Sequence, residues 1–145
     1  MLVVLSITCG LVLTTVGIHY SALTYLSAFL QRRKVHVRRW VAVAILGMLL
    51  AHVIEISLFA LGFELFEWLD GYGELVGNME DTNTAYWYYS FVVYTSLGFG
   101  DITPTHELRL MTGLETLTGL ILIAWSASFI FMQMHRFWDI GPDDS

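Results

Sequence analysis

The sequence predicts an all-α membrane protein with three transmembrane helices and one shorter re-entrant helix. Of the 145 residues, 56% are hydrophobic and only 14% are charged, whereas about a quarter are charged in an average soluble domain. The charges are unevenly placed, because residues 1–31 contain no Asp, Glu, Lys or Arg. Three stretches reach the roughly 20 apolar residues that cross a bilayer. A single cysteine, Cys9, excludes an internal disulfide framework.

The first predicted helix occupies residues 1–31, with its apolar part at Leu2–Leu30. It lacks a basic start and is longer than the roughly 7–15 apolar residues of a signal peptide, so we expect it to be retained. Its small residues fall on or near one helical face and predict close packing on a neighbouring helix; the alternative is a scatter of small residues without a partner. These residues are Ser6, Gly10, Thr14, Gly17 and Ser21.

A short basic connection, residues 32–39, separates the first two spans. It holds five of the seven basic residues, namely Arg32, Arg33, Lys34, Arg38 and Arg39. By the positive-inside rule the connection is cytoplasmic, so the N-terminus is expected outside and the C-terminus inside the cell. The compactness of the chain is the basis for expecting a multi-pass protein of the plasma membrane. These residues lie between spans rather than within one, so they do not resemble a voltage sensor. Binding of anionic lipid headgroups is a second expected role.

The second span is Trp40–Phe63, within an outer helix predicted at 40–69. An acidic loop is expected to follow from Glu64, and the chain carries eight acids between Glu64 and Glu107. An acidic outer surface raises the local concentration of cations. The alternative is ordinary solubilising charge.

The next segment is too short to cross the membrane. Thr82–Gly100 contains nineteen residues without a formal charge, and its apolar part predicts a helix at 83–95. Gly98, Gly100 and Pro104 then stop the helix. The chain should enter the membrane and return to the same side, and irregular backbone at that depth is tolerated only where protein or a watery pore surrounds it.

The third span is Leu110–Met134, within an inner helix predicted at 108–134. Gly119 is a possible bending point on this helix, although close packing is the favoured interpretation. The tail 135–145 is short, and we expect it to carry no sensing domain, so that gating would come from the membrane part, from a partner, or be absent.

Glycines at alternate positions suit a backbone whose successive carbonyls point the same way, the arrangement that replaces the hydration shell of an alkali cation. The run Thr95-Ser96-Leu97-Gly98-Phe99-Gly100-Asp101 resembles the T-x-x-G-[YF]-G-D filter signature of pore-loop potassium channels, and the similarity extends over residues 40–134. It departs from the commonest form, T-V-G-Y-G, at Ser96, Leu97 and Phe99.

This resemblance implies a homotetramer, in which three identical subunits complete the pore around each chain. It implies K⁺ as permeant ion, with no cofactor, at the carbonyls of residues 96–99, within a filter at 95–101. The Ser96 hydroxyl would lie at the inner mouth, Asp101 just outside, and the first helix outside the two-helix core.

Further residues are candidates for supporting the filter or gating the channel. Glu55 lies inside the second span with His52 one turn earlier, and Glu115 lies inside the third. We hypothesise that these residues brace the pore segment by hydrogen bonds, as a proton-sensitive element; the alternative is a structural pair with satisfied hydrogen bonds. Tyr88 and Tyr89, near the start of the short helix, are also candidates.

Other functions are kept as alternatives or excluded. The alternatives are a weakly selective monovalent cation channel and a non-conducting accessory subunit with a pore-like fold. A potassium transporter module is disfavoured because no internal repeat is found. The chain shows no nucleophile triad and no nucleic-acid footprint, and its one His-x-x-Glu motif falls short of the two that a dinuclear metal bundle requires. The sequence therefore predicts a protein that is not an enzyme.

Overall fold

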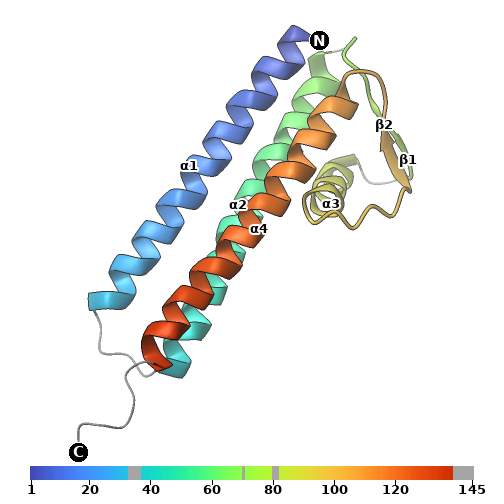
Figure 1. The fold of residues 1–145 in the computed structure, drawn as a ribbon. Helices are drawn as coiled ribbons and strands as arrows, with labels where there is room; N and C mark the ends of the chain where they lie inside the picture. Colours follow the sequence, from blue (N-terminus) through green and yellow to red (C-terminus); the bar gives the residue numbers. More distant parts are fainter. Residues whose placement is uncertain (33–36, 70, 80–81, 139–145) are drawn as a thin grey trace, which may run out of the picture.

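The computed structural model describes residues 1–145 except 33–36, 70, 80–81 and 139–145. It confirms the all-α class, with three helices long and apolar enough to cross a membrane. In chain order the elements are α1 (Leu2–Arg32), α2 (Val37–Leu69), β1 (Leu75–Gly77), α3 (Thr82–Tyr94), β2 (Ile102–Pro104) and α4 (Leu108–Trp138) (Figure 1).

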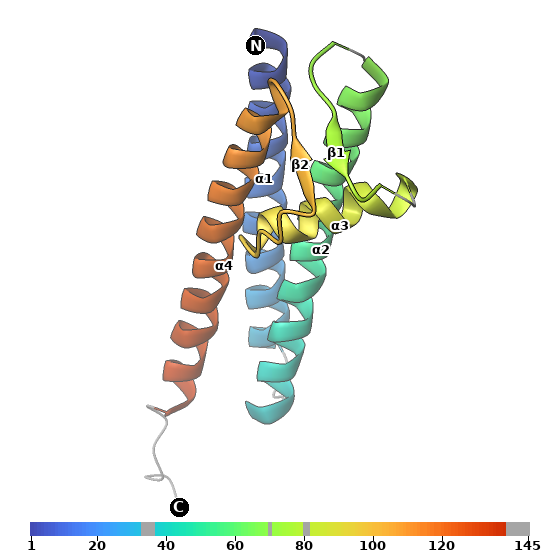
Figure 2. The same ribbon diagram turned by 90° about the vertical axis from the view of Figure 1, so that its right-hand side faces the viewer.

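The long helices α1, α2 and α4 lie side by side, and the short helix α3 lies across α2 and α4 (Figure 2). α2 ends and α4 begins at the same end of the bundle, where the N-terminus also lies (Figures 1 and 2). The chain between them therefore enters the bundle and returns to the same end. This is the re-entrant arrangement that the sequence predicts.

A two-stranded pairing, which the sequence analysis did not predict, holds the ends of the re-entrant segment together. β1 pairs antiparallel with β2, with Leu75 opposite Pro104 and Gly77 opposite Ile102. Just beyond the strands, the Glu74 backbone N–H donates to the Thr105 hydroxyl oxygen over 2.9 Å. The chain before α3 is thus hydrogen-bonded to the chain that follows residues 95–101.

α2 ends at Leu69, the end predicted for the outer helix, so Glu64 and Glu67 lie on its last turns and not in the acidic loop where they were expected. Phe59, Phe63 and Phe66, spaced four and three residues apart, are all fully buried in the main core. This apolar stripe extends the packed face of α2 beyond the hydrophobic span itself.

The face of α1 that was predicted to pack on a neighbouring helix is not the face that packs within this chain. Its small residues are exposed, and a Cβ added at Gly10 or Gly17 would meet nothing within 4 Å. The Ser21 hydroxyl donates to the Gly17 carbonyl over 2.7 Å. A hydroxyl satisfied by its own helix needs no partner helix, so smallness alone did not identify the buried face.

A different face of α1 packs on α2 and α4. Its buried residues follow helical spacing and include three polar side chains; they are Val4, Thr8, Thr15, His19 and Leu23. α1 lies at one side of the module formed by α2, α3 and α4, as expected, but it contributes a buried histidine to the interior (Figure 1).

Candidate functional site

The residues Thr95–Asp101, here called the signature segment, connect α3 to β2 about halfway along the bundle (Figure 2). All seven residues are exposed in the single chain. Leu97 is 58% and Phe99 64% exposed although both are large and apolar. An apolar, exposed stretch of this kind indicates a surface that other groups cover.

The signature segment begins directly from the cap of α3. The Ser96 N–H donates to the Val93 carbonyl and the Leu97 N–H to the Val92 carbonyl, each over 2.9 Å. Ser96 has a positive φ of 54°. These features make a Schellman cap, in which a left-handed residue ends the helix and satisfies its last carbonyls. The Ser96 hydroxyl donates to the Thr95 carbonyl over 2.7 Å.

The backbone then alternates in handedness. Gly98 and Gly100 have φ of 60° and 79°, whereas the intervening Leu97 and Phe99 are not in the left-handed region. Together with Ser96, every second residue from 96 to 100 is left-handed. Such alternation turns successive peptide units the same way, so that their carbonyls can line one side of the segment.

Two tyrosines of α3 bond to the signature segment and to α4. The Tyr88 hydroxyl donates to Asp101 Oδ2 over 2.8 Å, and this hydrogen bond raises the pKa of Tyr88 above its ordinary value. The Tyr89 hydroxyl lies 2.8 Å from the Thr112 hydroxyl on α4. Phe99 has no hydroxyl, so Tyr88 supplies the side-chain bond to the outer end of the segment.

Glu55 is the centre of a polar cluster that we define as His19, His52, Glu55, Tyr94 and Ser126. Glu55 is fully buried and accepts a hydrogen bond from the Tyr94 hydroxyl. Nδ1 of His19 lies 2.9 Å from Glu55 Oε1, and Nδ1 of His52 lies 3.0 Å from Glu55 Oε2.

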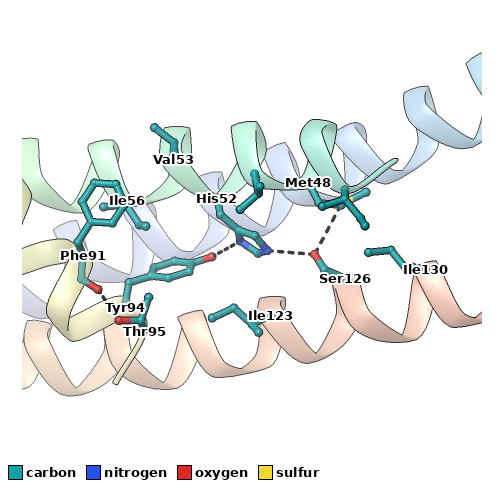
Figure 3. A pocket seen from close by; sticks show the side chains of 12 residues that line it. Met48, His52, Val53, Ile56, Phe91, Tyr94, Thr95, Ile123, Ser126 and Ile130 are labelled. Atoms are coloured by element: carbon teal, nitrogen blue, oxygen red, sulfur yellow. Dashed lines mark hydrogen bonds between the residues drawn. The ribbon is translucent and has the colours of Figure 1, made fainter. Parts of the chain in front are cut away.

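The polar cluster joins all four helices. Nε2 of His52 lies 3.1 Å from the Ser126 hydroxyl of α4, and Figure 3 shows Tyr94, His52 and Ser126 in a row. Tyr94 is the last residue of α3 and directly precedes Thr95. The cluster therefore anchors the chain at the point where the signature segment begins.

Glu115 makes a separate contact with α3. It is fully buried and accepts a hydrogen bond from the Ser90 hydroxyl, which also lies 2.9 Å from the Ile56 carbonyl oxygen. Among the described residues, Glu115 Oε2 has no hydrogen-bond partner. Glu115 and Glu55 thus contact the short helix through different side chains rather than forming one site.

Gly119 is a point of close approach between α4 and the end of α3. A Cβ at this position would lie 2.2 Å from the Tyr94 carbonyl oxygen. At Gly113 on the same helix a Cβ would meet nothing within 4 Å.

Four residues that contact the polar cluster or α3 were not predicted from the sequence: His19, Ser90, Thr112 and Ser126. His19 carried a signal, because it shares a helical face with Thr8 and Thr15 in an otherwise apolar span, and polar side chains in membrane helices turn toward protein. Ser90, Ser126 and Thr112 carried no such signal in the sequence, since a hydroxyl can always donate to a carbonyl of its own helix. Of the basic connection, Arg39 is exposed, whereas Arg33 and Lys34 lie outside the described residues.

A short helix followed by an alternating glycine-containing segment, held between two membrane-crossing helices, defines a pore-loop module. The family model described as ion channel matches residues 46–136, which include α3, the signature segment and most of α2 and α4. The chain belongs to this ion channel family. No curated protein and no solved structure matches it with significant similarity.

Proposed function

We propose that the chain is one subunit of a homotetrameric channel that conducts K⁺ passively, with no cofactor and no catalysis. The carbonyls of Ser96, Leu97, Gly98 and Phe99 would bind the permeant ion. The observation that carries this proposal is the alternation of left-handed residues through the signature segment. A row of carbonyl oxygens can replace the hydration shell of K⁺.

The exposure of the signature segment supports a tetramer. One segment cannot enclose an axial pore, and four copies related by a closed rotation can. Leu117, Leu120 and Ile121 of α4 are also between 48% and 57% exposed in the single chain. In the tetramer these faces would meet neighbouring subunits, the central cavity or lipid.

The charge layout supports an orientation for this channel. The basic connection would face the cytoplasm of a plasma-membrane protein and contact anionic lipids. The N-terminus and the acidic chain around β1 would then lie outside, where negative charge raises the K⁺ concentration near the mouth.

The experiment is K⁺ flux into liposomes that contain the purified tetramer, measured with and without Ba²⁺. A matched pair of substitutions isolates the signature segment. Gly98→Ala and Gly71→Ala both replace a glycine of positive φ, 60° and 82°, where a Cβ meets nothing within 4 Å. Each pays a similar backbone strain, of about 1 kcal/mol or more.

We expect wild type and Gly71→Ala to show Ba²⁺-sensitive K⁺ flux and Gly98→Ala to lose it while remaining tetrameric. If well-formed wild-type tetramers gave no flux, the chain would be a non-conducting subunit. If Na⁺ flux equalled K⁺ flux, it would be a weakly selective cation channel.

A further inference from the structure

Three side chains of residue types that can bind metal ions lie close together inside the bundle. In sequence they are far from the signature segment. His19 belongs to α1, and His52 and Glu55 belong to one face of α2. A donor atom of each lies within 4.8 Å of those of the other two. We propose that they bind one divalent transition-metal ion of the Zn²⁺ class. This site is independent of which ion the pore conducts.

The donor set and its spacing suit this ion. Two imidazoles and one carboxylate form an established ligand set for Zn²⁺, whose bonds of about 2.0–2.2 Å place tetrahedral ligands about 3.3 Å apart. Each histidine Nδ1 already lies 2.9 or 3.0 Å from a Glu55 oxygen. Since all donor atoms lie within 4.8 Å of one another, no pair would have to close by more than about 1.5 Å to reach tetrahedral spacing.

With both imidazoles neutral, Glu55 ionised and the Tyr94 hydroxyl donating to Glu55, a count of protons leaves the cluster one donor short. A neutral imidazole carries one N–H, and a serine carries one O–H. If both histidines donate from Nδ1 to Glu55, both Nε2 atoms need a donor. The Ser126 hydroxyl lies 3.1 Å from His52 Nε2 and 3.4 Å from His19 Nε2, and its single proton can serve only one of them.

A metal ion bound at the two Nδ1 atoms and Glu55 removes this deficit. Both histidines then carry their proton on Nε2 and donate to Ser126, whose oxygen can accept twice. The Ser126 proton points to Met48 Sδ, 3.5 Å away. Metal-bound histidines commonly direct their second ring N–H to such an acceptor. One extra proton on an imidazole or on Glu55 balances the same cluster, and so does donation from the Tyr94 hydroxyl to His52 Nδ1, 3.0 Å away. Metal content is therefore the measurement that decides.

A pocket beside His52 leaves room for a water ligand. The His52 side chain is 15% exposed and lines a pocket of about 340 Å³ together with Tyr94 and Ser126 (Figure 3). A zinc site with three protein ligands keeps a fourth position that a water can fill. The sequence analysis expected no metal because it considered only a dinuclear bundle and did not assign His19 a partner.

The test measures metal bound to the purified tetramer. Protein stripped with a chelator is equilibrated with Zn²⁺, freed of excess metal and analysed for zinc per chain. Co²⁺ loading reports coordination by four ligands through its visible absorption. His19→Gln removes one ligand, and His106→Gln is the matched control, because His106 lies in the connection before α4, outside the cluster. Ser126→Ala removes only the outer acceptor.

We expect one zinc per wild-type chain, none in His19→Gln and one in His106→Gln. Ser126→Ala should weaken zinc affinity about 10- to 100-fold. If His19→Gln fails to assemble, the wild-type Co²⁺ spectrum and the Ser126→Ala affinity decide. Wild-type tetramers without stoichiometric metal, or zinc lost in His106→Gln and kept in His19→Gln, would overturn the proposal.

Discussion

The contact between Gly119 and Tyr94 supplies the sharpest structural prediction. In Gly119→Ala the new methyl would lie 2.2 Å from the Tyr94 carbonyl oxygen and 3.0 Å from Tyr94 Cδ1. The first distance is about 1 Å too short for a van der Waals contact, and the obstacle is backbone. Either α4 or the end of α3 has to move.

The steric cost of the new methyl group in Gly119→Ala is opposed by the higher helix propensity of alanine. Overpacking of a tight contact costs about 1–3 kcal/mol, whereas replacing a glycine inside a helix by alanine gains about 0.5–1 kcal/mol. The net expectation for Gly119→Ala is a loss of up to about 2 kcal/mol per subunit. Gly113→Ala has the same helical gain without the clash, and it should be neutral or stabilising.

The assay compares the two variants by the fraction of tetramer that survives a graded heat step, measured by size-exclusion chromatography, and by K⁺ flux. Gly119→Ala should lose tetramer at a lower temperature and conduct less, because Tyr94 leads directly into the signature segment. Gly119→Ala that is as stable as an undamaged Gly113→Ala would refute the close approach. Equal damage from Gly113→Ala would show that contacts outside the single chain dominate.

Three further outcomes follow from the contacts of α3. Tyr88→Phe removes the bond to Asp101 and should weaken K⁺ over Na⁺ selectivity in liposome flux while tetramers persist; unchanged selectivity would show that the bond is dispensable. Because the pKa of Tyr88 is raised in the folded protein, its stabilising contribution is fully present below the ordinary tyrosine value of about 10 and is lost as pH rises through the folded value. The difference in thermal stability between wild type and Tyr88→Phe should therefore stay constant near neutral pH and shrink above about pH 10; a difference that shrinks near neutrality would contradict this. Glu115→Gln keeps an acceptor for Ser90 and should preserve tetramer stability, whereas Glu115→Leu should cost about 0.5–1.5 kcal/mol by removing this bond, because the Ser90 hydroxyl can still donate to the Ile56 carbonyl; equal stability of the two variants in a heat-step assay would remove the role of this contact.

The parts of the fold that the sequence predicts are those with a strong local signal. Long apolar runs predict α1, α2 and α4, and the uncharged run that ends in glycines and a proline predicts the turn back to the same end. The β1–β2 pairing has three residues in each strand, too few for a periodic pattern. It depends on the re-entrant segment bringing its own ends together.

The candidate site also contains some features that residue type predicts and others that depend on how the helices pack. Glycines at alternate positions indicate alternating backbone handedness at Gly98 and Gly100, because glycine accepts positive φ without strain. The third left-handed residue, Ser96, arises from the cap of α3 and is not evident from residue type. His19 and Glu55 are 36 residues apart, and their contact depends on how α1 rotates against α2. The predicted packing face of α1 is the one with small residues, whereas the face with polar residues is the one that is buried.

Potassium selectivity is the central claim, and the reversal potential across a bilayer with K⁺ on one side and Na⁺ on the other tests it most directly. Purified wild-type tetramers should give a reversal potential displaced toward the K⁺ equilibrium value, and Gly98→Ala should give no current. A wild-type reversal potential near zero under these conditions would contradict the claim.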